Sequence, residues 1–171
     1  LCICGSLSLP ARKVTSFNAG WLFKKGPFYT DPLKLINQWN GQWEAVNLPH
    51  TWNAKDMQEK VAAYYQGVGY YKKEQFFGNE LKGKRVFLRF EGVGAVAEVY
   101  VNKKLVGTHK GGYGAFAFEI TRALNLGATN EILVKADNAS RDDVIPINHS
   151  LFGVYGGIYR PVWLIVTEPN N

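Results

Sequence analysis

The side chains that could perform acid–base chemistry are scattered along this chain and form no catalytic pair. Histidine is the usual proton shuttle near neutral pH, but His149 has no acid or nucleophile beside it in the pattern. The glutamates that stand out fall in expected strands or turns, where a solvated position is the ordinary role: Glu44, Glu91, Glu98 and Glu119. We therefore expect no catalytic residue within the chain.

Metal and phosphate chemistry also lack the residues they need. Asp142 and Asp143 could begin a site for a hard cation, but calcium requires six or more oxygen ligands and no loop of that pattern is present. Cys2 and Cys4 give neither a disulfide framework nor a metal cluster. The glycine-rich run 109–113 lacks the Gly-Lys-Ser/Thr signature of a phosphate cradle. We expect no metal, cofactor or nucleotide in this chain.

Aromatic content is a further unusual feature. With 171 residues the chain can form one compact domain, yet its five Trp, nine Tyr and ten Phe exceed what a core of that size needs. Such rings suit either stacking on sugar rings or packing against a neighbouring domain, and we favour the second. The net charge of +6 comes largely from short basic pairs spread along the chain, so we expect no nucleic-acid partner.

The elements that must position these residues are strands. The runs 85–91 and 97–101 both alternate between two faces, and Asn102 can adopt the left-handed backbone that a tight hairpin after the second run requires. Further strands are expected at 13–17, 44–48, 70–77, 115–120, 131–137 and 161–167.

About eight strands with long connections predict an all-β protein, a jelly-roll β-sandwich, rather than an immunoglobulin fold. At most one or two short helices are expected, at 121–126 and at 32–39, where Asp31 can cap the helix and Pro32 can open it.

The ends of the chain differ in composition from this domain. We expect the sandwich over 13–168, a disordered leader over 1–12 and a linker to a further domain over 169–171. The segment 1–11 is apolar with small residues, so it is either the remnant of an export signal or a simple leader. No segment is long and apolar enough to span a bilayer. We expect an exported bacterial protein of the periplasm or cell surface.

Linked motifs then occur in a fixed order: FNAGWLF at 17–23, LPHTWN at 48–53, GVGYY at 67–71, the glycine- and aromatic-rich stretch 90–116, and GGIYR at 156–160. In this order they resemble glycoside hydrolase family 2, whose members include β-galactosidases, β-glucuronidases and β-mannosidases. The resemblance is to the N-terminal sugar-binding domain, over about residues 16–167. The chain is most similar to the β-galactosidases, and the resemblance implies a galactose-binding-like β-sandwich. A parent enzyme of the β-glucuronidase or β-mannosidase type is the alternative.

The resemblance implies a division of labour within a larger enzyme. Family members carry an immunoglobulin-like domain and then a TIM barrel with two catalytic glutamates, which cleave a β-linked glycoside with retention. Those domains of the same protein are the implied partners. The resemblance leaves open whether the parent protein is an oligomer and whether it uses magnesium or sodium. The chain itself would support the barrel and form part of the wall of the substrate pocket.

Four residues are carried over as candidate sugar contacts. Asn53 matches an asparagine in a loop at the edge of the family's active site. Its amide suits a sugar contact, because it can both donate and accept hydrogen bonds with hydroxyls. A turn-forming role for Asn53 stays open. Asn148, His149 and Ser150 stand where related sequences often place an aspartate, which weakens the galactose assignment.

Two residues are expected to have structural roles. Trp52, two residues after His50, would help pin its loop against the sandwich edge, and Arg160 would pair with a carboxylate across the sandwich or contact a neighbouring domain. Two other functions remain open. The chain could be a free-standing carbohydrate-binding module or a protein-interaction domain.

Overall fold

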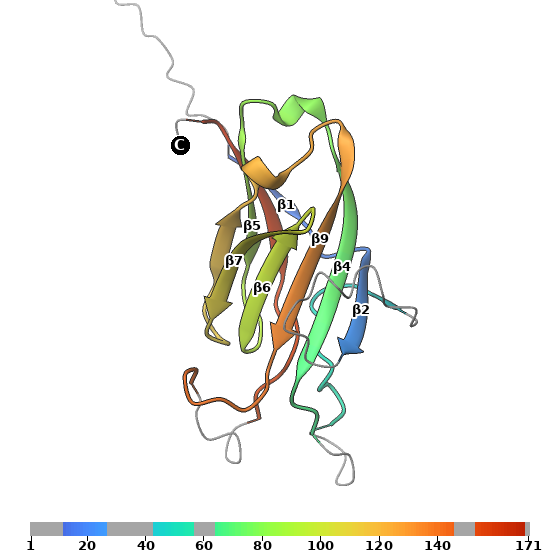
Figure 1. The fold of residues 1–171 in the computed structure, drawn as a ribbon, viewed down its shortest axis with the longest axis vertical. Helices are drawn as coiled ribbons and strands as arrows, with labels where there is room; N and C mark the ends of the chain where they lie inside the picture. Colours follow the sequence, from blue (N-terminus) through green and yellow to red (C-terminus); the bar gives the residue numbers. More distant parts are fainter. Residues whose placement is uncertain (1–11, 27–42, 57–63, 146–152, 170–171) are drawn as a thin grey trace, which may run out of the picture.

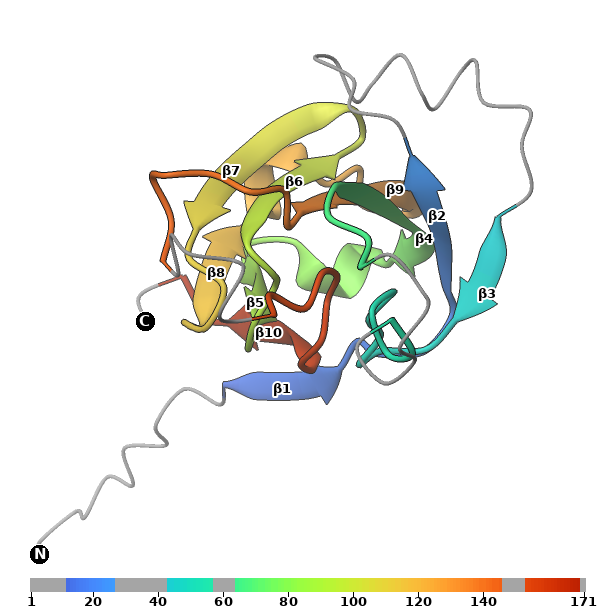
Figure 2. The same ribbon diagram turned by 90° about the horizontal axis from the view of Figure 1, so that it is seen from below.

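The computed structural model describes residues 12–26, 43–56, 64–145 and 153–169. Alternating side chains give two antiparallel sheets that pack face to face (Figures 1 and 2). The strands are β1 (Lys13–Ser16), β2 (Trp21–Gly26), β3 (Glu44–Val46), β4 (Val68–Phe77), β5 (Arg85–Phe90), β6 (Val96–Val101), β7 (Lys104–Lys110), β8 (Phe116–Glu119), β9 (Ala128–Asp137) and β10 (Val162–Thr167). Two short 3-10 helices are also present, η1 (Asn79–Leu81) and η2 (Thr121–Ala123).

The order of the strands places distant parts of the chain side by side. One sheet has the order β1-β10-β5-β8, and the other has the order β3-β2-β4-β9-β6-β7. Every pairing is antiparallel, and the first described strand lies against the last, with Lys13 opposite Val166. The all-β sandwich predicted from the sequence is confirmed and is consistent with a jelly roll. No helix in the described ranges has the length and apolarity to cross a membrane.

The core lies between the two sheets. Alternate residues of β5, from Val86 to Phe90, and of β6, from Ala97 to Val101, face inward and are buried. Trp21 on β2 is buried in the same cluster, and its indole nitrogen donates to the Phe17 carbonyl oxygen at 2.8 Å. A large ring with a satisfied N–H fits a core of this kind, because burying an unpaired donor would cost free energy.

Most expected strands are present, with ends that differ by a few residues. The strand at β2 was missed, since its alternation covers only Trp21 to Phe23 before two lysines and a glycine. With β2, and with β7 counted separately from its hairpin partner, ten strands are described instead of about eight. The expected helical turn is η2, which is followed by Gly127 at φ +75°. The expected helix over 32–39 lies outside the described residues, as does nearly all of the expected leader.

The hairpin between β6 and β7 turns at two residues with left-handed backbone. Asn102 has φ +49° and Lys103 has φ +66°, as a two-residue turn between twisted strands requires. The Asn102 amide also donates to the Ala123 carbonyl oxygen at 2.8 Å and to Asn130 at 2.6 Å. The role foreseen for Asn102 is confirmed, but Lys103 adopts a conformation that disfavours a side chain.

The substitution Lys103→Gly is therefore expected to raise the free energy of unfolding by about 0.5 kcal/mol, since glycine adopts a left-handed backbone without strain. Urea denaturation measures the change. The matched variant Lys104→Gly, at the first position of β7, should lower stability by a similar amount, because it loosens a strand. A loss of stability in Lys103→Gly would contradict the strain assigned to this turn.

Candidate functional site

Six loops meet at one end of the sandwich, which we call the loop end. In Figure 1 they lie at the lower end, away from η1 and η2, and Figure 2 looks onto them. They come from segments far apart in the sequence: 47–56, 64–67, 91–95, 111–115, 138–145 and 153–161. Loops gathered on a rigid sandwich are the usual place for binding residues.

Asn53 is the centre of the hydrogen bonding at the loop end, and its side chain is 0% exposed. Its Nδ2 donates to Asp56 Oδ2 at 3.0 Å and to the Tyr65 carbonyl oxygen at 2.9 Å. Its Oδ1 accepts from Gly156 N at 2.8 Å and from Asn138 Nδ2 at 3.2 Å. An amide has two donor hydrogens and two acceptor positions, so these bonds occupy the whole side chain. In this arrangement Asn53 holds loops together and presents no free polar atom to a sugar.

Asn138 extends the same network to the strand that precedes its loop. It follows β9 and is fully buried, and its Oδ1 accepts from Gly67 N at 2.8 Å. Its Nδ2 also donates to the Val154 carbonyl oxygen at 2.8 Å. Two buried asparagines therefore join four loops at the point where β4 begins and β9 ends. No local sequence pattern marks this pairing, since the two residues are 85 positions apart.

Trp52 packs beneath this network. Its ring lies parallel to Phe23, with centroids 5.8 Å apart, and only a small edge of it is exposed. Two glycines make room for the indole, because a Cβ would lie 2.3 Å from it at Gly69 and 2.0 Å from it at Gly156. The position is that of a core residue which fixes its loop to the sandwich.

His50 joins the same loop to β4. Its Nδ1 lies 2.8 Å from the Tyr71 hydroxyl, and its backbone N–H donates to the Ile158 carbonyl oxygen at 2.8 Å. Burial lowers the pKa of His50, because the charged ring loses water, although nearby Glu44 opposes the shift. Burial also raises the pKa of Tyr71, which stays protonated.

The lowered pKa of His50 predicts a dependence of stability on pH. The unfolded chain binds more protons than the folded chain below the ordinary histidine value of 6.5, so the free energy of unfolding should fall as the pH drops through that value. Urea midpoints measured between about pH 5 and 7.5 should show this slope, and His50→Asn should flatten it. Equal slopes in the two proteins would rule out this contribution.

Two exposed tyrosines lie on the accessible surface of the loop end. Tyr113 is 56% exposed and Tyr155 is 46% exposed. Two half-buried tyrosines anchor the loops that carry them, since Tyr159 donates its hydroxyl to the Gly112 carbonyl oxygen and Tyr64 to that of Val154. Rings held in this way can pack against the apolar face of a sugar. Sequence reasoning noted the aromatic excess without identifying these residues.

A shallow hollow lies beside Tyr113, between the loops 111–114 and 143–145, with a volume of about 310 Å³. Asp143 at its edge is held by Lys110 Nζ and Arg141 Nε, each at 2.5 Å, and these donors lower the pKa of the carboxyl. Asp143 is therefore ionised under ordinary conditions and cannot serve as a proton donor. In the part of the chain that the structure describes, no cluster of three metal-ligating side chains is found.

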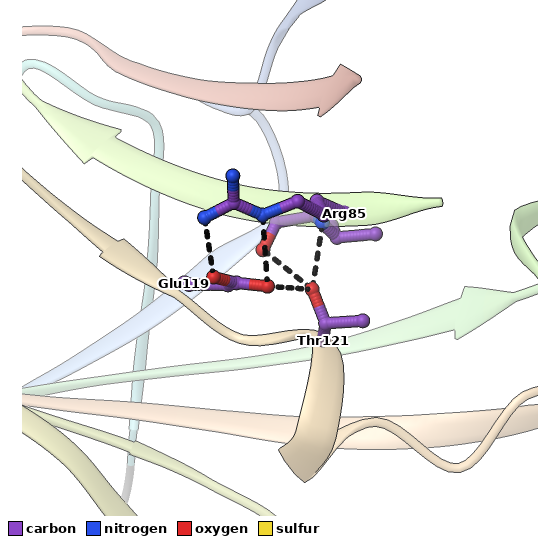
Figure 3. A network of polar contacts seen from close by, with 4 residues as sticks. Arg85, Glu119 and Thr121 are labelled. Atoms are coloured by element: carbon purple, nitrogen blue, oxygen red, sulfur yellow. Dashed lines mark hydrogen bonds and ion pairs between the residues drawn. The ribbon is translucent and has the colours of Figure 1, made fainter. Parts of the chain in front are cut away.

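Three of the four glutamates singled out in the sequence, Glu91, Glu98 and Glu119, are held by basic side chains. Glu119 accepts hydrogen bonds from Arg85 at 2.8 Å and from Thr121 at 2.9 Å, and these donors lower its pKa (Figure 3). Glu91 and Glu98 each pair with a basic side chain at 2.8 Å. A general acid at neutral pH needs a raised pKa, so Glu119 has the opposite property.

Four further residues were predicted to contact a sugar, a carboxylate or a neighbouring domain. Arg160 is exposed, its guanidinium lies 5.6 Å from the centroid of the Tyr159 ring, and within the described ranges no carboxylate is at ion-pair distance. A contact between Arg160 and a neighbouring domain stays a prediction. Asn148, His149 and Ser150 lie outside the described residues, so their predicted contacts with a sugar also remain predictions.

Known proteins are similar to this chain in both sequence and fold. A family model described as "Glycosyl hydrolases family 2, sugar binding domain" matches residues 15–169. A crystal structure from Bacteroides fragilis, described as a "putative beta-galactosidase", is 71% identical, with a TM-score of 0.85, and the match covers 92% of this chain and 24% of that one. A β-glucuronidase of Bacteroides uniformis is 36% identical, with a TM-score of 0.79, over 92% of this chain and 18% of that one.

Curated relatives are also β-glucuronidases and β-galactosidases. A β-glucuronidase of Bacteroides fragilis is 45% identical over 142 residues, which are 78% of this chain and 20% of the relative. A β-galactosidase of Thermoanaerobacter pseudethanolicus is 37% identical, and the match covers 94% of this chain and 22% of the relative. The chain thus spans about a fifth of the length of the curated relatives it matches.

Proposed function

Because the chain belongs to the sugar-binding domains of glycosyl hydrolase family 2, we propose that it forms one wall of the substrate pocket in a larger glycosidase. The substrate would be a β-galactoside or a β-glucuronide, the two classes named for its relatives. The catalytic glutamates would lie outside these residues, in a barrel domain of the same protein. Cleavage would then proceed with retention through a covalent glycosyl intermediate.

The observation that carries this proposal is the construction of the loop end. Tyr113 and Tyr155 present exposed rings from two loops. The buried amides of Asn53 and Asn138 fix the backbone on both sides of Tyr155, and the Tyr159 hydroxyl holds the loop of Tyr113. Rigid rings can orient a sugar by packing on its C–H face while leaving its hydroxyls to other groups. The described carboxylates with lowered pKa, such as Glu119, provide no acid catalyst.

We also propose that the protein is exported, because the segment 1–11 resembles the end of a signal peptide. Fractionation of the cells that produce it tests this, and a protein found only in the cytosol would contradict it. No step of the proposed sugar binding depends on export.

Calorimetric titration of the chain with methyl β-galactoside tests the proposed pocket wall. A wall separated from the rest of its pocket should bind in the millimolar range, and Tyr155→Ala should weaken binding about threefold to tenfold. Phe76→Ala is the matched control, since Phe76 is an aromatic residue 58% exposed on β4, away from the loop end. Equal effects of the two variants would contradict the assignment.

The second candidate is a free-standing carbohydrate-binding module, which the exposed tyrosines also favour. Micromolar affinity for an oligosaccharide in the same titration would support the module, because a complete site needs no second wall. Hydrolysis of nitrophenyl β-galactoside by the purified chain would contradict both candidates.

A further inference from the structure

The outer face of the four-stranded sheet has a hollow with a volume of about 370 Å³. We call it the arginine hollow, and its lining residues are Arg12, Phe87, Arg89, Ala117, Ile165 and Thr167. The register places Ile165 opposite Phe87 and Ala117 opposite Arg89, so these side chains share the face that points away from the core. The floor is apolar, and the charged groups lie around it.

One cation of this face, Arg12, has no ion-pair partner within the described ranges. Three of the six arginines of the chain lie here, and two are neutralised locally, Arg89 by Glu91 and Arg85 by Glu119 (Figure 3). Arg12 has no acidic partner among the residues that the structure describes. Guanidinium matches a carboxylate with two parallel hydrogen bonds, so an anionic group suits this position.

Thr167 adds an unsatisfied polar group to the same hollow. The residue is 9% exposed, and its hydroxyl has no hydrogen-bond partner in the described structure. A buried hydroxyl without a partner costs about 1–3 kcal/mol, so native proteins rarely retain one that nothing pairs with. A ligand that offers a donor or an acceptor here would remove that cost.

The size of the face favours a small molecule over a protein partner. Four strands about 4.8 Å apart, with at most six residues each, cover roughly 300 Å². A stable protein interface buries about 800 Å² on each partner. The volume of the arginine hollow instead falls in the range of small-molecule pockets, about 300–1,000 Å³.

We propose that the arginine hollow binds an acidic saccharide unit, a hexuronate, apart from the loop end. Its carboxylate would pair with Arg12, the apolar C–H face of its ring would lie on Phe87 and Ile165, and a hydroxyl would hydrogen-bond to Thr167. A pyranose chair with an apolar C–H face and a rim of polar groups fits an apolar floor bounded by polar groups. The choice of a sugar rests on the proposed function, whereas the hollow and the lack of an acidic partner for Arg12 among the described residues do not.

Amide resonances of the chain, titrated with methyl β-glucuronide and with neutral methyl β-glucoside, test this proposal. The glucuronide should shift Phe87, Ile165 and Thr167, and the glucoside should not. Arg12→Gln should weaken glucuronide binding about tenfold or more, the usual effect of losing a charged hydrogen bond. Lys104→Gln removes the same charge from the other sheet and should leave the affinity unchanged.

Three other results would overturn the proposal, and each would refute a different part of it. Shifts at the loop end alone would refute the arginine hollow and leave the proposed pocket wall standing. Equal shifts with the glucoside, or full affinity in Arg12→Gln, would refute the carboxylate contact. Resonances of this face that change with protein concentration instead of ligand would identify a protein interface.

Discussion

Replacing Asn53 with alanine is expected to lower the free energy of unfolding by about 3 kcal/mol and to disorganise the loop end. The substitution leaves the Gly156 N–H buried without its acceptor and removes the bonds that hold Asp56 and Tyr65. Each buried polar group left unpaired costs about 1–3 kcal/mol, and a small cavity adds to this. Urea denaturation measures the loss.

The same variant separates the two roles considered for Asn53. A residue that only touches sugar would lose affinity when replaced and keep its stability, because no internal bond would be broken. Asn47→Ala is the matched control, since Asn47 is exposed and its side chain accepts one bond, from Gly20 N at 3.1 Å. We expect this control to cost less than about 1 kcal/mol. Equal costs for the two variants would contradict the central place given to Asn53.

The second large effect is expected for Gly157→Ala, with a loss of about 3 kcal/mol or more. Gly157 has φ +104°, where a side chain is strained. An added Cβ would also lie 2.4 Å from the Tyr71 hydroxyl oxygen and 2.8 Å from the His50 carbonyl oxygen. Both atoms belong to the contact that joins the His50 loop to β4, so the backbone must move. Thermal unfolding followed by circular dichroism measures the loss.

Substitutions of two other glycines separate the backbone strain from the steric clash. Gly83 has φ +80° with no atom within 4 Å of an added Cβ, so Gly83→Ala should show the backbone strain alone, about 1 kcal/mol. Gly114 has open space and an ordinary φ, and Gly114→Ala should be nearly neutral. If Gly157→Ala cost no more than Gly83→Ala, the close packing assigned to Gly157 would be wrong.

Local patterns were enough to predict most strands of the scaffold. Alternation over 85–91 and 97–101 predicted β5 and β6, and Asn102 predicted the turn after them, because these signals depend on neighbouring residues alone. The strand β2 was missed because only its first half alternates; its pairing with β4 supplies the rest. The order of the motifs predicted the family, which the family model confirms.

The loop end could be predicted only in part, because its bonds join residues far apart in the sequence. The resemblance to the family pointed to Asn53, but the acceptor role of its side chain depends on Gly156, 103 residues away. Tyr113 and Tyr155 look like ordinary tyrosines until the fold exposes them on loops of the same end. The residues of the arginine hollow come from three strands and from the position before β1, and no sequence motif marks them.

The central claim is that a sugar binds this domain at the loop end. Titration of the isotope-labelled chain with methyl β-galactoside, followed residue by residue through amide resonances, tests it most directly. We predict saturable shifts in the millimolar range that cluster in the loops of Tyr113 and Tyr155 and weaken in Tyr155→Ala. Shifts confined to either sheet face, or no shift at the loop end at saturating sugar, would contradict the claim.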